Sequence, residues 1–270
     1  MSIPFCGWRA RLTVLAILVV CGIVPMAASA QLLVSPLRLT FEGRQRSAVL
    51  TLSNTDKVPR SYRLSWVEQV MTPEGGLRQL SQEEIAGRRI ASPMLAFSPR
   101  QITINPGEQQ TVRVALRRPP DLIDGEYRSH LMFEALPPPT PAGERGQVKV
   151  NVVVSLTIPV IVRQGRVVTT ARIDQAGLRR ADDGSLLMDV VVGRQGNGSS
   201  IGAMDIIFRP DGGRDQAIGQ LNNVAIYPEV DRRRFSVPLT GALAGPGALS
   251  ILYRGAGDAV TLARQDFRIQ

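Results

Sequence analysis

One stretch, residues 147–164, limits the possible folds of this chain more than any other. Every even position from 148 to 162 in QVKVNVVVSLTIPVIVRQ is Val, Leu or Ile, whereas most odd positions are polar or charged. An apolar residue at every second position is typical of a β-strand with one buried face. These 18 residues are about three times the usual strand length of about 5–6. At about 3.3 Å per residue the strand would span about 55 Å, so we expect part of it to reach beyond the core of its own domain.

Pro159 lies within this stretch and has no backbone N–H to donate to a neighbouring strand. We therefore expect at least one edge of the strand to be unpaired near Pro159. An apolar edge with free backbone groups promotes aggregation, and a protein that keeps one commonly uses it to bind a partner. The stretch therefore predicts a β fold and a site for strand addition.

The same alternation recurs through most of the chain after residue 30, interrupted by turn residues. About seven short strands are predicted in residues 31–164, and seven more in residues 165–270. This pattern predicts an all-β protein made of two tandem immunoglobulin-like β-sandwich domains with those boundaries. Because the apolar alternation stops at Gly165 and Arg166, we expect a short hinge there.

Two local signals interrupt the β pattern of the first predicted domain. Residues 32–41 alternate around Pro36, which predicts an edge strand or a strand that passes from one sheet to the other. Residues 71–90 form a long polar loop, and its segment Ser81-Gln82-Glu83-Glu84 is typical of a helix capping box. We therefore expect one short helix in that loop.

The first 30 residues have the features of a signal peptide for export. Arg9 and Arg11 precede an apolar run at residues 12–24, and Ala28-Ser29-Ala30 is typical of a cleavage site. We therefore expect cleavage after Ala30 and no stable membrane insertion. A retained anchor is the alternative, but the run is shorter than the roughly 20 residues that a membrane span needs.

The two cysteines, Cys6 and Cys21, both lie in the predicted signal peptide. The chain that begins at Gln31 would therefore contain neither disulfides nor reactive thiols, although an exported compartment permits disulfides.

The sequence offers few groups for catalysis or metal binding. His130 is the only histidine and lies in a predicted strand, so we expect a structural or surface role for it, and no metal site made of His and Cys. Residues 193–198, GRQGNG, are similar to a phosphate-binding loop only in composition, because no helix pattern follows them, and we predict a turn. We therefore expect that the protein is not an enzyme and uses no cofactor.

The formal net charge of +9 would suit an anionic partner. However, the arginines are scattered between apolar positions, and no aromatic platform for stacking bases accompanies them. We therefore expect no binding of nucleic acid.

Three stretches give the chain a resemblance to a known family: LRLTFEG at 37–43, DGEYRSHLMFEALPP at 124–138 and TIPVIVR at 157–163. They resemble the periplasmic chaperones of the chaperone-usher pathway, which fold pilus or fimbrial subunits and deliver them to an outer-membrane usher. The resemblance spans nearly all of residues 31–269 but is strong only in the first domain. It implies a periplasmic location and these two partners.

The resemblance also implies a mechanism for the long strand. In this family the subunit is a sandwich that lacks one strand, and the chaperone inserts its own strand in the gap, a form of β-strand addition. By register with the family, the residues expected to enter the subunit are Val148, Val150, Val152 and Val154. The alternative is that these valines fill the core of their own domain.

The family anchors the terminal carboxylate of its subunit with two basic residues in the cleft between the domains. The first corresponds to Arg38, whose guanidinium fork suits a carboxylate, unless Arg38 is only a solvated residue of an edge strand. The second family position, a lysine, falls on Pro159. We expect Arg128 on the neighbouring strand to replace it.

A charged network at the domain junction is also implied by the resemblance. Glu126 and Arg163 match its family positions. The acid expected from the second domain aligns with Gly255, so Asp258 is the candidate to replace it.

Two other classes of function stay open at this stage. One is a secreted adhesin or carbohydrate-binding sandwich, whose ligand site would be the polar loop at residues 71–90. The other is a structural protein of the cell envelope that polymerises through its own open edge.

Overall fold

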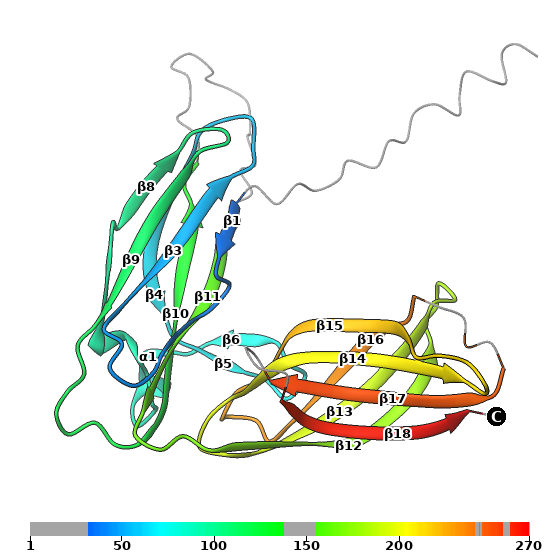
Figure 1. Cartoon of the computed structure of the whole chain (residues 1–270). Helices are drawn as coiled ribbons and strands as arrows, with labels where there is room; N and C mark the ends of the chain where they lie inside the picture. Colours follow the sequence, from blue (N-terminus) through cyan, green and yellow to red (C-terminus); the bar gives the residue numbers. More distant parts are fainter. Residues whose placement is uncertain (1–31, 138–154, 241–242, 244, 256–259, 270) are drawn as a thin grey trace, which may run out of the picture.

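The computed structural model describes residues 32–137, 155–240, 243, 245–255 and 260–269. Figure 1 shows two β-sandwiches that lie at a steep angle to each other, so that the molecule has the shape of an L. The predicted fold class, two immunoglobulin-like sandwiches in tandem, is confirmed. Within the described ranges, no helix is long and apolar enough to span a membrane.

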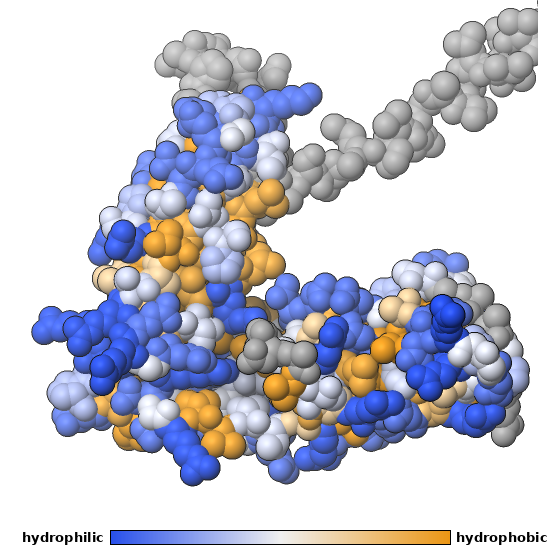
Figure 2. All heavy atoms as spheres, in the orientation of Figure 1, coloured by the Kyte–Doolittle hydropathy of each residue, from blue (hydrophilic) through white to orange (hydrophobic). Residues whose placement is uncertain are grey.

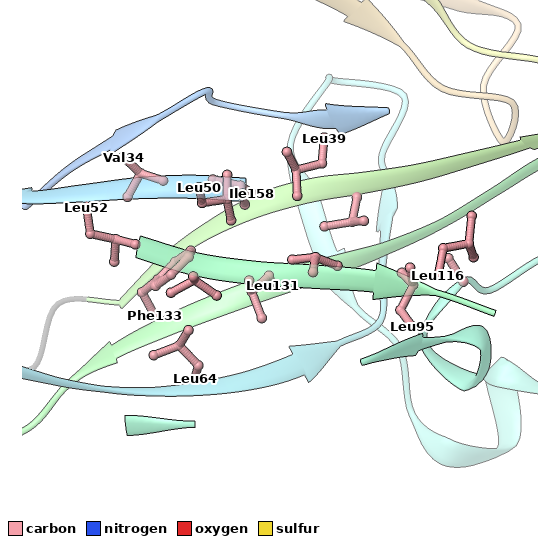
Figure 3. Packing of buried hydrophobic residues seen from close by; sticks show 14 of the residues in the cluster. Val34, Leu39, Leu50, Leu52, Leu64, Leu95, Leu116, Leu131, Phe133 and Ile158 are labelled. Carbon is pink, nitrogen blue, oxygen red and sulfur yellow. The ribbon is translucent and has the colours of Figure 1, made fainter. Parts of the chain in front are cut away.

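The first sandwich packs a four-stranded sheet against a five-stranded sheet. The four-stranded sheet has the order β1 (Leu32–Ser35), β3 (Ser47–Asn54), β9 (Gln109–Leu116), β7 (Leu95–Ser98). The five-stranded sheet has the order β2 (Leu39–Phe41), β11 (Ser155–Gln164), β10 (Gly125–Ala135), β4 (Arg60–Val67), β8 (Gln101–Ile104). Figure 3 shows Leu50, Leu131 and Phe133 in the layer between these sheets, and all three are fully buried.

The first strands pass from one sheet to the other, as the sequence predicts. β1 pairs with β3 in the four-stranded sheet, whereas β2 pairs in parallel with β11 in the five-stranded sheet. Pro36 lies between the two strands and cannot donate a backbone hydrogen bond. The chain can therefore leave one ladder and join the other at this point.

The described part of the long strand, β11, is paired unequally on its two edges. One edge pairs with β10 along the whole strand, from Ser155 opposite Glu134 to Gln164 opposite Gly125. The other edge pairs with β2 only at residues 160–162. Among the described residues, no strand pairs with this second edge at residues 155–159. For this part of the chain, the prediction of an unpaired edge near Pro159 is confirmed.

The alternation predicted for the strand also holds in its described part. Leu156, Ile158, Val160 and Val162 all belong to the core of the first sandwich or pack against it. Ile161 is on the opposite face and yet fully buried, because it packs in the core cluster of the second sandwich. Residues 147–154, the other part of the predicted strand, lie outside the described residues.

The polar loop at residues 71–90 contains more structure than the sequence predicts. β5 (Gln69–Met71) and β6 (Leu77–Gln79) form a hairpin that was not predicted. The predicted helix is confirmed as α1 (Gln82–Ile85), one turn long, with its capping box: the Ser81 hydroxyl accepts from the backbone N of Glu84 at 3.4 Å, and the Glu84 carboxylate accepts from the backbone N of Ser81 at 2.9 Å. A 3₁₀ turn, η1 (Ser92–Met94), leads into β7.

The second sandwich contains a counterpart for each of its seven predicted strands. One sheet has the order β12 (Thr169–Arg180), β13 (Leu186–Gly196), β16 (Arg232–Pro238). The other has the order β15 (Gln216–Ile226), β14 (Ser200–Pro210), β17 (Gly247–Gly255), β18 (Thr261–Ile269). The predicted domain boundary between residues 164 and 165 stays a prediction, and it falls between β11 and β12.

Candidate functional site

Arg38 lies at the inner corner of the L, directly before β2. Its side chain is half-buried, and within the described part of the chain it makes neither a hydrogen bond nor an ion pair. Burial lowers the pKa of the guanidinium, and the charge of Arg163 lowers it further, while Tyr227 and Glu126 act in the opposite direction. Arg38 is therefore a partly desolvated cation without a counter-ion, which favours the binding of an anion.

A cavity of about 610 Å³ adjoins Arg38 between the two sandwiches. The first sandwich contributes Arg38, Thr40 and Arg163 to its wall, and the second contributes Ser199 and Ser200. The Glu42 carboxylate lines the same space, and Arg163 and the Ser199 hydroxyl already donate to Glu42 and Glu126. Among the described residues of this lining, Arg38 is therefore the guanidinium that is free to bind a carboxylate.

The structure brings Glu126 and Arg163 together at the junction of the sandwiches. The side chain of Glu126 is only 1% exposed, and its Oε2 accepts from Arg163 Nε at 3.2 Å. The same oxygen accepts from the backbone N of Ser199 at 3.0 Å and from its hydroxyl at 2.8 Å. Arg163 also donates to Glu42 at 2.7 Å. In the described residues, therefore, the contact from the second sandwich comes from Ser199, and Asp258 lies outside those residues.

Arg128 belongs to a second group of contacts at the junction and does not line the cavity at Arg38. Its guanidinium forms an ion pair with Glu229, lies 3.7 Å from the ring centre of Tyr227, and donates to the carbonyl of Gln69 at 3.2 Å. Its side chain is only 8% exposed. As a second carboxylate anchor, Arg128 would have to exchange Glu229 for the carboxylate of a ligand.

Glu229 connects three segments of the chain. Its Oε1 also accepts from the backbone N of Met71 at 2.7 Å. Burial raises the pKa of Glu229, but the hydrogen bond and the charge of Arg128 outweigh this effect, so the pKa lies below its ordinary value. Glu229 therefore stays ionised and holds both β10 and the β5–β6 hairpin.

The β5–β6 hairpin is the part of the first sandwich that reaches over the second, as Figure 1 shows. Met71 is buried in the core cluster of the second sandwich. At the tip of the hairpin, Gly75 has a φ of +88°, which favours glycine, and a Cβ atom there would lie 2.2 Å from Arg233 Nε, so a larger residue would strain the backbone and displace the Arg233 side chain. Sequence analysis missed this interdomain contact, although the Gly75-Gly76 pair between Met71 and Leu77 is a signal for a hairpin turn.

Apolar residues are exposed on the first sandwich. Leu37, two residues before β2, is 56% exposed. Figure 2 shows apolar residues along the side of the first sandwich that faces the open angle of the L. The four valines predicted to enter a partner, Val148, Val150, Val152 and Val154, lie outside the described residues.

Residues 31–165 match the family of pili and flagellar-assembly chaperones, through its PapD N-terminal domain. This match covers half of the chain. The chain belongs to this chaperone family. A comparison with curated proteins gives no match.

Several solved chaperone structures are similar to this chaperone at low identity. The class 5 fimbriae chaperone CfaA is 13% identical, with 88% of this chain and 97% of that chain covered and a TM-score of 0.44. The Pseudomonas aeruginosa CupB2 chaperone is 12% identical, with 87% and 98% covered and a TM-score of 0.45. A chain in the CsuC-CsuE chaperone-tip adhesion subunit complex of Acinetobacter baumannii is 13% identical, with 89% and 98% covered and a TM-score of 0.43.

His130 lies on the junction side of the five-stranded sheet, opposite Val67 on β4 and Pro159 on β11. It is fully buried, and neither ring nitrogen has a hydrogen-bond partner in the described structure. Burial and then the charge of Arg128 lower its pKa to about 3, while Glu229 acts in the opposite direction. The chaperone therefore holds His130 as a neutral imidazole.

We predict that the chaperone loses stability in acid because of His130. Unfolding releases the imidazole to its ordinary pKa of about 6.5, so the contribution of His130 is complete above that pH and decreases towards pH 3. The expected loss between pH 7.5 and pH 5 is about 2 kcal/mol. Urea unfolding followed by the fluorescence of Trp66, the only tryptophan after residue 30, measures it.

The control variant for this prediction is His130→Leu, which cannot take up a proton. Because His130 is the only histidine, this variant should remove most of the stability loss between pH 7.5 and pH 5. Equal losses in the variant and the unmodified chaperone would contradict the prediction.

Proposed function

We propose that this chaperone binds pilus or fimbrial subunits in the periplasm by lending them a strand of its own, and then delivers them to an outer-membrane usher. Membership of the assembly-chaperone family supports the general role. The observation that carries the proposed mechanism is the unpaired edge of β11 at residues 155–159. A subunit strand added there would complete the hydrogen bonds of this edge, as in other cases of β-strand addition.

The lent strand is proposed to be β11 extended towards its N-terminal side. Val148, Val150, Val152 and Val154 continue the apolar alternation of Leu156 and Ile158, and each would fill a position in the open core of the subunit. Burying a valine contributes about 1.5–3 kcal/mol before the costs of ordering. Four such residues would provide most of the favourable free energy of binding.

Arg38 is the proposed anchor for the terminal carboxylate of the subunit. Its support is geometric: a half-buried guanidinium without a partner among the described residues lines the cavity between the sandwiches. A charged hydrogen bond to a carboxylate would fix the register of the added strand. The role of Arg128 as second anchor stays a prediction, and its ion pair with Glu229 counts against it.

This function requires no catalysis and no cofactor. Binding and release of a strand change only non-covalent contacts, which agrees with a family of assembly chaperones. Cleavage of the signal peptide after Ala30 stays a prediction.

Replacing Val152 by aspartate should abolish the recovery of soluble subunit from the periplasm, because a carboxylate cannot enter the apolar core of the subunit. The measurement is co-purification of a subunit with the tagged chaperone after co-expression. Val49→Asp is the matched control, because Val49 is an exposed valine on β3, in the other sheet of the first sandwich. Normal subunit recovery with Val152→Asp would refute the proposed mechanism.

Replacing Arg38 by alanine should weaken binding about 10- to 100-fold, because a hydrogen bond to a charged group is worth about 1.5–3 kcal/mol. The test uses a peptide with the sequence of the last strand of a subunit, once with a free carboxylate and once with a terminal amide. The loss should occur only with the free carboxylate, and the melting temperature of the chaperone should not change. Arg113→Ala, at an exposed arginine on β9, is the control. An equal loss with both peptides would contradict the role of Arg38.

A further inference from the structure

The two sandwiches are joined through two loops of the second one. The interdomain hydrogen bonds described above all end on residues of these loops. On the side of the first sandwich they involve Glu126, Arg163, Arg128 and Met71. The first loop connects β13 to β14 and contains Ser199, which binds Glu126. The second connects β15 to β16 and contains Glu229, which binds Arg128 and Met71. The positions of these two loops therefore contribute to how the sandwiches meet, together with the apolar contacts of Met71 and Ile161.

Arg194, near the end of β13, binds both loops with one guanidinium group. Its Nη1 donates to the carbonyl of Gly196, the last residue of β13, at 2.8 Å and to that of Gly198 in the first loop at 2.9 Å. Its Nε donates to the carbonyl of Val230 at 3.3 Å, and its Nη2 to that of Pro228 at 3.1 Å, in the second loop. The side chain is only 4% exposed. One buried side chain thus links the neighbours of Ser199 to the neighbours of Glu229.

Only arginine can make this set of contacts. The guanidinium has five N–H donors in a rigid planar fork, and four carbonyls from two directions accept from it here. Lysine has its donors on a single nitrogen and could not reach both loops in the same way. Without arginine, these carbonyls would lose the side-chain donor that they have among the described residues, and leaving a buried acceptor unpaired is unfavourable.

Two glycines allow the first loop to fold around Arg194. Gly196 has a φ of +115°, and a Cβ atom there would lie 2.0 Å from the carbonyl oxygen of Val168. At Gly198 a Cβ atom would lie 2.3 Å from Val167 Cγ1. The turn predicted for residues 193–198 is wrong for its first part, because residues 193–196 form the end of β13 and pair with β12, and only residues 197–199 form the loop.

We propose that Arg194 is a positioning residue that fixes the angle between the two sandwiches. It does so by holding the loops of Ser199 and Glu229 at a constant separation. The same angle sets the cavity at Arg38 and the space beside the open edge of β11. The effect of Arg194 on the angle is independent of the proposed function. The importance of the angle for subunit binding rests on that function.

The test measures the distance between two spin labels, one on each sandwich, in the chain that begins at Gln31. Because both cysteines precede this residue, Gln109→Cys on β9 and Gln216→Cys on β15 provide unique labelling sites at exposed positions. With Arg194→Lys or Arg194→Gln, we expect a shifted mean distance or a wider distribution. Arg179→Lys is the matched control, because Arg179 is exposed and pairs with Asp189 within the second sandwich. It should leave the distribution unchanged.

The possible outcomes separate positioning from simple stabilisation. Circular dichroism shows whether Arg194→Gln unfolds the second sandwich. If it does, the distance distribution of the milder Arg194→Lys variant tests the proposal. An unchanged distance distribution in folded Arg194→Lys would overturn the proposal, even if its melting temperature falls. Since no subunit is present, a failure of the proposed function would not alter this measurement. A changed distance distribution would support the role of Arg194 in setting the angle. If the same variant still captures subunits normally, the angle is not important for binding.

Discussion

The incomplete backbone pairing of β11 is the constraint on which the rest of this structure depends. Burial of Leu156, Ile158, Val160 and Val162 and pairing with β10 hold the strand in the first sandwich. On its other edge, pairing with β2 stops at Val160, next to a proline that has no N–H to offer. An exposed strand edge normally favours aggregation, and proteins usually cover it. Here the first strand instead crosses to the other sheet, which leaves room beside β11 for a strand from another protein.

The junction of the sandwiches determines what lies next to this edge. Two polar contact groups, Glu126 with Ser199 and Arg128 with Glu229, lie in surroundings where few of their atoms reach solvent. Breaking either group would leave a buried charge without its partner, which is more costly than the loss of an exposed ion pair. Met71 and Ile161 add apolar contacts between the same surfaces. These contacts favour one arrangement of the sandwiches, and in that arrangement Arg38 lines the cavity with no ion-pair partner among the described residues.

Local patterns predicted the strands, the change of sheet at Pro36 and the capping box, because each depends on neighbouring residues. They did not predict contacts between distant segments. Met71 and Glu229 are separated by 158 positions, and nothing in either neighbourhood indicates that they meet. Ile161 indicates the junction in the sequence, because it is an apolar residue at an outward position of the strand. Family resemblance placed Arg38, Glu126 and Arg163 at the junction, but it could not foresee that Glu229 would bind Arg128.

Hydrogen exchange along β11 tests the central claim most directly, because it reports on the backbone hydrogen bonds themselves. In the free chaperone, the amides of residues 155–158 should exchange faster on average than those of residues 160–162, which have strands on both sides. Addition of a subunit should slow exchange at residues 155–158 and leave residues 160–162 nearly unchanged. Equally slow exchange of both segments in the free protein, or no slowing at residues 155–158 in the complex, would contradict the account.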